Sequence, residues 1–297
     1  IPQFTIYCLL LMAWLGAQTH FAADPYYLLL VEKSQFQGQL PLSNNLFRPV
    51  FINTDTLAVT FTMRNEGYYN DNAPNQENMD VRYFSKGFAN FSSVQLAINS
   101  PYFSFLAEPY LMTSKSFATN GVSRGDHFSV LNDVPLSKGQ LSNSPFRNLL
   151  AFIHYKGFGF GWHMGNRWWG PGIHTSLEMT NNTYPIPAQV LGTVQEIRIG
   201  SIGFFGQHTL ARLNETKGVG AKYLTALNGQ FTWYGPVILT AGFSRVYLSG
   251  GIMSAGGYVW KEKDARLLVF EGIFTSNLME NDYTIGGHDS WDQTLSG

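Results

Sequence analysis

The sequence predicts an all-β protein, an antiparallel transmembrane β-barrel of the outer-membrane type, and three observations carry that prediction. Charged residues make up 13% of the chain and aromatic residues 15%, whereas a soluble domain usually carries about twice that charge. Apolar and polar residues alternate along several segments, which is typical of strands with one apolar face. Beyond the N-terminal region no run approaches the roughly 18 apolar residues of a spanning helix, so a membrane-embedded chain must close as a barrel.

The first 23 residues are interpreted as a secretory signal peptide that is truncated at its N-terminus. Residues 6–15 form an apolar run that is too short to cross a membrane, and small residues follow at 16–17 and 22–23. Neither an initiating methionine nor a basic segment precedes this run. The single cysteine, Cys8, would leave with the signal, so the mature chain is expected to contain no disulfide.

Two segments show the clearest alternation of apolar and polar side chains. In 57–66, Val59, Phe61 and Met63 alternate with threonines and Arg64, and 93–99 repeats the pattern. A soluble sandwich and a membrane barrel both produce such strands, but a barrel predicts apolar residues outside and polar residues inside. Residues 26–37 are expected to form a first strand.

The rest of the chain is expected to complete a partial barrel over 24–297. Four glycines share one face of 157–165 with His163, and we expect an inward loop to pack closely there, with direct ligand contact as the alternative. Residues 113–148 are rich in Ser, Asn, Gly and Pro and predict a long loop. Residues 289–297 end without a terminal aromatic strand, so the barrel is expected to lack its C-terminal strands.

The most distinctive motif is NRWWGPG, which starts at Asn166. Paired indoles beside an arginine suggest an aromatic–basic platform, because sugar rings stack on indoles and guanidinium groups bind hydroxyls or carboxylates. Packing or membrane-interface roles for the tryptophans are equally compatible with the sequence. The candidate glycan-binding residues are Arg167, Trp168, Trp169, Asn181 and Asn182, with a turn at Gly170, Pro171 and Gly172.

The stretch GNRWWGPGIHTSLEMTNNTYPIPAQVLGT, which covers 165–193, resembles the signature of the Wzi-like capsule assembly family of outer-membrane proteins. The later pieces LNGQFTWYGPVILTAGFSRVYLSGG and DSWDQTLSG resemble further blocks of that family in the same order. The similarity extends from about Leu57 to the end of the chain. It implies a large outer-membrane barrel that retains capsular polysaccharide with lectin-like behaviour. The family's best-known branch has a helical periplasmic portion near its N-terminus, a pattern that 24–55 lacks.

The function expected from these observations is non-enzymatic assembly and surface attachment of capsule or exopolysaccharide in the bacterial outer membrane. The expected partners are that polysaccharide and outer-membrane lipid, and a capsule export machinery is a further candidate. A net charge of -1 gives no electrostatic basis for binding nucleic acid. No cofactor is expected. Replacement of both Trp168 and Trp169 with alanine would weaken polymer retention without preventing insertion if the platform is exposed, whereas failure to insert would make them structural.

Two other classes of function stay open. A diffusion porin would line its lumen with opposed charges, for which the candidates are Arg64, Glu66, Glu196 and Arg198. A secreted β-sandwich lectin or a glycan hydrolase is disfavoured by the low charge. A hydrolase would need a carboxylate pair such as Glu178 with Glu196, or Asp126 with Asp133. The spacing of His163 and His174 is a poor metal signature, so no metal site is predicted.

Overall fold

The structure is a computed structural model, and it describes only part of the chain. The described residues are 20–21, 25–40, 42–43, 46–49, 51–52, 57–71, 80–82, 87–114, 145–172, 176, 178–181, 185–216, 220–251, 259–270 and 291–296. The expected signal peptide up to residue 19 lies outside them, as does most of the loop expected at 113–148.

Strands dominate the described part of the chain, and two helices accompany them. The bounds are β1 (His20–Phe21), α2 (Pro25–Phe36), β2 (Phe47–Arg48), β3 (Phe51–Ile52), β4 (Ala58–Asn70), β5 (Gly87–Asn99), β6 (Phe103–Ser114), β7 (Phe146–Tyr155), β8 (Phe158–Gly165), β9 (Trp168–Trp169), β10 (Ile186–Thr193), β11 (Ile197–Ile199), β12 (Ile202–Thr216), β13 (Gly220–Tyr234), β14 (Ile238–Gly250), α3 (Glu262–Leu268) and β15 (Trp291–Ser296). Among the described residues, no helix has the length and apolar character needed to cross a membrane.

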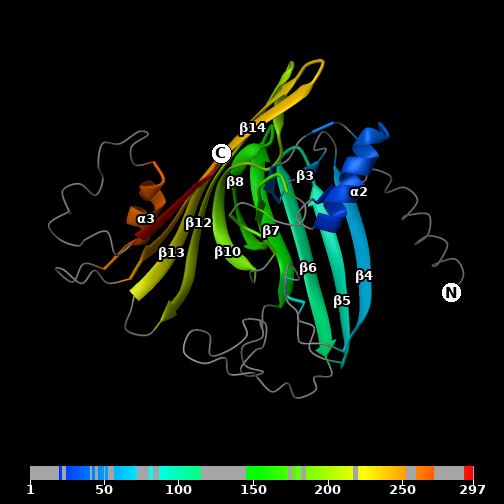
Figure 1. Cartoon of the computed structure of the whole chain (residues 1–297), viewed down its shortest axis with the longest axis horizontal. Helices are drawn as coiled ribbons and strands as arrows, with labels where there is room; N and C mark the ends of the chain where they lie inside the picture. Colours follow the sequence, from blue (N-terminus) through cyan, green and yellow to red (C-terminus); the bar gives the residue numbers. More distant parts are fainter. Residues whose placement is uncertain are drawn as a thin grey trace, which may run out of the picture.

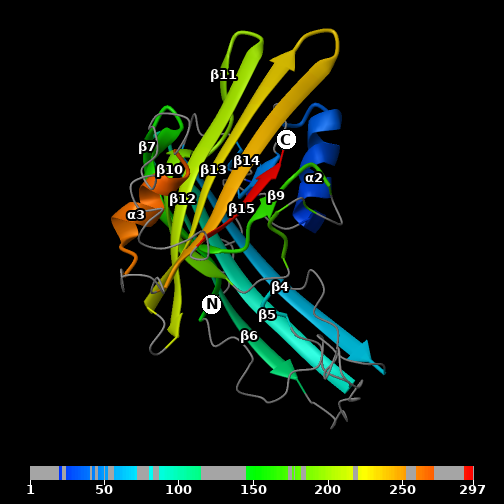
Figure 2. The same cartoon turned by 60° about the vertical axis from the view of Figure 1, so that its left-hand side comes forward.

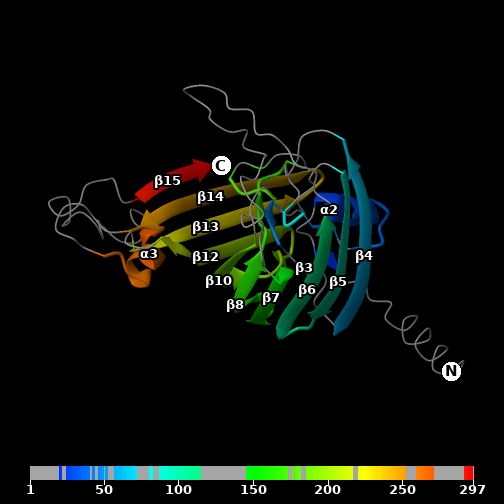
Figure 3. The ribbon, with the colours of Figure 1, turned by 90° about the horizontal axis from the view of Figure 1, so that it is seen from below.

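The expected antiparallel all-β architecture is confirmed. In the described residues, an 11-stranded sheet has the order β15-β14-β13-β12-β10-β8-β7-β6-β5-β4, with β11 paired to β12 (Figures 1 and 2). The sheet is strongly curved, but within this part of the chain its edge strands β4 and β15 do not pair with each other, so no closed barrel is seen (Figure 3). β15 occupies 291–296, where the sequence predicted no terminal strand, and it pairs with Ser244–Ser249 of β14.

The two faces of the sheet differ in polarity as the alternation predicts for a barrel, with apolar residues outside and polar residues inside. Directly paired residues share a face, so the register assigns each side chain to the outer, convex face or to the inner, concave face. The large exposed side chains of the outer face are mainly apolar, such as Met63 at 73% and Ile153 at 77%. Buried polar side chains gather on the inner face; they include Ser93, Asn99, Ser104, Glu108, Gln207, Asn228, Gln230, Thr232 and Ser244.

A small inserted layer covers part of the inner face. β2 pairs with β9, and Phe47 and Trp169 from this pair pack against Phe205 and Ala226 of the sheet. Val31 of α2 joins the same cluster. Residues 25–36 are therefore helical, and the first strand expected at 26–37 is wrong. A short apolar run does not distinguish a strand from a buried helix, and Pro25 at the first helical position is compatible with a helix start.

The glycines at 157–165 lie where the neighbouring strand approaches closely. A Cβ on Gly161 would come within 2.4 Å of the carbonyl oxygen of Ala151 on β7. At Gly165 it would meet the side chains of Asn148 and His163, each at 2.5 Å. Close packing is therefore found, but it comes from β7 and from inner-face side chains rather than from the expected inward loop.

The connections at the two ends of the sheet differ in length. One end, the short-turn end, carries the connections 100–102, 156–157, 194–201 and 235–237. The other, the long-connection end, carries 71–86, 115–145, 166–185, 217–219 and 251–290. Figures 1 and 2 show α2 at the short-turn end, the end of the β13–β14 hairpin. This asymmetry is typical of outer-membrane barrels, which have short turns on one side and long loops on the other.

Candidate functional site

The candidate site is the segment that contains the WWGPG motif, and the sheet buries it. Trp168 is 0% exposed, Trp169 1% and Arg167 2%. Both tryptophans belong to β9, where Trp169 pairs with Phe47 and Trp168 with Arg48. The indole faces are therefore covered by protein, and the arrangement corresponds to the packing interpretation of the tryptophans rather than to an exposed stacking surface.

Backbone hydrogen bonds hold the motif turn in place. The N–H of Trp169 donates to the carbonyl oxygen of Met179 at 3.0 Å, and the N–H of Gly170 donates to that of Leu46 at 2.8 Å. The indole Nε1 of Trp168 donates to the carbonyl oxygen of Gly172 at 2.6 Å, which closes the turn. Gly170 has a φ of 142°, a conformation that favours glycine. Of the turn residues, Pro171 is the exposed one.

Arg167 is buried and hydrogen-bonds to the backbone of two strands. Its guanidinium donates to the carbonyl oxygens of Gly165 at 3.3 Å, Ile186 at 3.0 Å and His163 at 3.1 Å. These contacts join the end of β8 to the start of β10. Burial lowers the pKa of Arg167 to about 10, because a charged group loses hydration away from water. Its three carbonyl partners use the fork geometry of arginine, which lysine cannot reproduce.

Asn181 is also buried, and its backbone connects the motif segment to another connection. The N–H of Asp80 donates to the carbonyl oxygen of Asn181 at 2.8 Å. Asp80 belongs to the β4–β5 connection, so two long connections meet over the inner face. Asn182 lies outside the described residues.

A cavity of about 400 Å³ borders the motif turn. Its walls include Trp169, Gly170 and Pro171 on one side and Thr240 and Phe243 of β14 on the other. In the described residues β15 pairs with only the Ser244–Ser249 part of β14, so the cavity lies along the unpaired part of that edge.

An ion-pair network on the inner face was missed by the sequence analysis except for two of its members. Arg147 Nε lies 2.8 Å from Asp80 Oδ2, and Arg147 Nη1 lies 3.0 Å from Glu108 Oε1. Arg82 continues the network from Asp80 to Glu66, at 3.5 Å and 3.1 Å. Arg64 and Glu66, proposed as porin lumen charges, do lie on the inner face, but they pair with each other at 3.4 Å. No local motif marks this network, because the chain brings its members together from four separate segments.

The candidate carboxylates Glu178 and Glu196 do not form an evident catalytic centre. Glu178 contacts the Ser244 hydroxyl opposite Asn228, whereas Glu196 lies over Gly203, which pairs with Thr232. Asn228 and Thr232 are four residues apart along β13, a distance of about 13 Å. The two catalytic carboxyl groups of a glycosidase lie roughly 5–9.5 Å apart, so Glu178 and Glu196 are too widely separated. Asp126, Asp133 and His174 lie outside the described residues.

Glu178 is expected to destabilise the folded protein at neutral pH. Burial raises its pKa despite hydrogen bonds from Ser244 and Ser296, and one carboxylate oxygen is buried without a hydrogen-bond partner. Because the pKa is raised on folding, the ionised form is disfavoured, and stability falls as the pH rises from about 4.5 through the folded pKa. Glu178→Gln should therefore raise the melting temperature at pH 8 and leave it unchanged at pH 4. An equal shift at both pH values would rule out the charge as the cause.

A comparison of the chain with family models, curated proteins and solved structures finds no significant match.

Proposed function

We propose that the chain is part of a non-enzymatic bacterial outer-membrane barrel that assembles or retains a capsular polysaccharide or exopolysaccharide at the cell surface. The polarity of the sheet is the observation that supports the membrane placement. The exposed side chains of the outer face are mainly apolar, and the inner face carries most of the buried polar groups. A soluble sheet normally buries its apolar face, so this arrangement is suited to hydrocarbon outside and a polar interior.

We further propose that the sheet closes in the membrane. An open sheet edge cannot persist in hydrocarbon, because its N–H and C=O groups would have no partners there. The edges at β4 and β15 would then be joined directly or through further strands. The long-connection end would face the cell exterior, as in other outer-membrane barrels.

The polysaccharide role rests on the resemblance of 165–193 to the Wzi-like family. Because Arg167, Trp168 and Trp169 are buried, we assign them the structural role of holding the inserted layer against the sheet. The exterior connections would make the glycan contacts, and many weak contacts to a repeating polymer add up through avidity.

The porin alternative is less well supported, because the inserted layer and the Arg147 ion pairs occupy part of the inner face.

The test is a comparison of cells with the intact gene and with its deletion, in which cell-bound and released polysaccharide are measured separately. We expect the total to be unchanged and the polymer to shift into the medium on deletion, with reversal by the wild-type gene. Unchanged pools would contradict the proposal and would favour the porin.

A further inference from the structure

On the basis of the proposed membrane placement, we propose that α3 marks the limit of the lipid-contacting surface. Hydrocarbon would contact the outer face of β12–β14 only near the short-turn end. α3 would cover the remainder of that face in the polar headgroup region, on the side of the long connections. The partner of the uncovered surface is lipid hydrocarbon.

The uncovered part of the outer face is apolar throughout. Its rows of directly paired residues across β12, β13 and β14 begin at the short-turn end. They are Ile202–Trp233–Leu239, Phe204–Phe231–Ala241 and Gly206–Gly229–Phe243. Their large side chains are all exposed, with Phe231 at 55% and Leu239 at 57%. Aromatic residues near strand ends are also what a bilayer interface favours.

The next rows along the same strands are of mixed polarity, and α3 covers them. His208, Leu227 and Arg245 form one row, and Leu210, Thr225 and Tyr247 form the next. Thr225 and Tyr247 are almost fully buried. The change from exposed apolar rows to covered mixed rows takes place between adjacent rows of one face.

α3 and the residue that follows it supply hydrogen-bond partners to polar groups of the sheet, whereas acyl chains could supply none. The His208 Nε2 atom lies 3.1 Å from the carbonyl oxygen of Arg266, and Arg245 Nη1 donates to that of Val269 at 3.1 Å. Arg266 also donates to Gln189 Oε1 on β10 at 2.9 Å. An unpaired polar group in hydrocarbon costs several kcal/mol, so lipid could not replace α3 over these rows.

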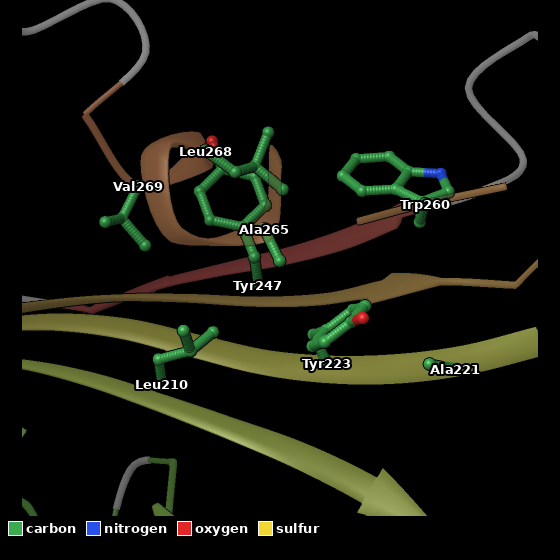
Figure 4. Packing of buried hydrophobic residues seen from close by; sticks show 8 residues of the cluster. All are labelled: Leu210, Ala221, Tyr223, Tyr247, Trp260, Ala265, Leu268 and Val269. Atoms are coloured by element: carbon green, nitrogen blue, oxygen red, sulfur yellow. The ribbon is translucent and has the colours of Figure 1, made fainter. Parts of the chain in front are cut away.

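Apolar packing fixes α3 to the sheet, and its exposed residues are mainly charged. Trp260, Ala265, Leu268 and Val269 pack on Leu210, Tyr223 and Tyr247 (Figure 4). Figure 3 shows α3 on the convex side of the sheet. Lys261, Glu262, Lys263 and Leu267 are exposed, and Glu262 accepts a hydrogen bond from Gln189 of β10 at 3.4 Å. Three of these four side chains are charged, which suits water and headgroups rather than acyl chains.

The other half of the sheet has no helix over its outer face. On β4 and β5 this face is apolar at Phe61 and Met63. A polar band follows, in which the exposed amide of Asn65 donates to Ser92 at 3.2 Å and accepts from Asn90 at 3.0 Å. Beyond this band, at the long-connection end, Tyr69 and Phe88 are again exposed at 65% and 66%. The displacement of the apolar surface towards the short-turn end is therefore confined to β12–β14, where α3 lies.

Bilayer depth measured at single cysteines tests the proposal. A fluorophore would be attached at Phe231→Cys and Leu239→Cys in the apolar rows, and at Lys263→Cys and Leu267→Cys on exposed positions of α3. The full chain would be reconstituted in phosphatidylcholine vesicles with and without bromine on the acyl chains. We expect strong quenching at the first two positions and little at the last two. Lys263→Cys and Leu267→Cys should also react with a membrane-impermeant maleimide.

The outcomes separate this inference from the membrane placement on which it rests. Quenching at Lys263→Cys and Leu267→Cys as strong as at Phe231→Cys would overturn the role of α3 and leave the membrane placement intact. No quenching at any of the four positions would overturn both. The capsule role is tested independently by the polysaccharide pools.

Discussion

Replacing Trp169 with alanine is expected to lower the free energy of unfolding by about 3–5 kcal/mol, the usual cost of truncating a large buried aromatic side chain. The indole packs with Phe47 and Phe205 between the inserted β2–β9 pair and the sheet. Alanine would leave a cavity at that junction and weaken the attachment of the inserted layer. The measurement is the temperature at which the folded species disappears in a heat-modifiable gel-mobility assay.

Trp233→Ala is the matched control, because Trp233 lies on the outer face and is 43% exposed. It should change the unfolding free energy in detergent by less than about 1 kcal/mol. The double replacement of Trp168 and Trp169 is expected to prevent insertion, which differs from the result expected for an exposed platform. A Trp169→Ala protein of normal stability that releases polysaccharide into the medium would instead show that the indole contacts glycan.

The alternation of side chains was sufficient to predict β4 and β5 and the polarity of their faces. Phe61 and Met63 lie on the exposed outer face, while Thr60 and Thr62 lie on the inner face, as the period-2 pattern of 57–66 predicts. Such a pattern is local, since each strand must present one set of residues to each face. It does not determine how many strands pair or whether the edges meet.

The site could be located from the sequence, but its burial could not. A tryptophan pair beside an arginine has the same composition whether the indoles stack on sugars or pack in a core. The choice depends on β2, which covers Trp169 from more than 100 residues earlier in the chain. The same is true of α3, whose short sequence gives no sign that it covers Thr225 and Tyr247.

Replacing Arg147 with methionine is expected to destabilise the protein by about 3–5 kcal/mol, because it removes the partner of two buried carboxylates. Asp80 and Glu108 both bind this guanidinium, and all three side chains are at most 5% exposed. Asp80 would lose the ion pair that holds the β4–β5 connection over the inner face. We therefore expect a lower melting temperature and, in planar bilayers, a conductance larger than that of the wild-type protein.

Arg266→Met provides the control, because the Arg266–Glu262 pair has side chains that are 43% and 47% exposed. Exposed pairs of this kind contribute about 0–1 kcal/mol, so its loss should leave stability and conductance nearly unchanged. If Arg147→Met matched this control in both measurements, the network would not hold the connection in place. If the wild-type protein itself conducted as strongly as the variant, the inner face would be open, and the porin interpretation would gain support. The difference in conductance between Arg147→Met and Arg266→Met therefore measures how much the ion pairs of the inner face, rather than the loss of any one arginine charge, block passage through the concave side of the sheet.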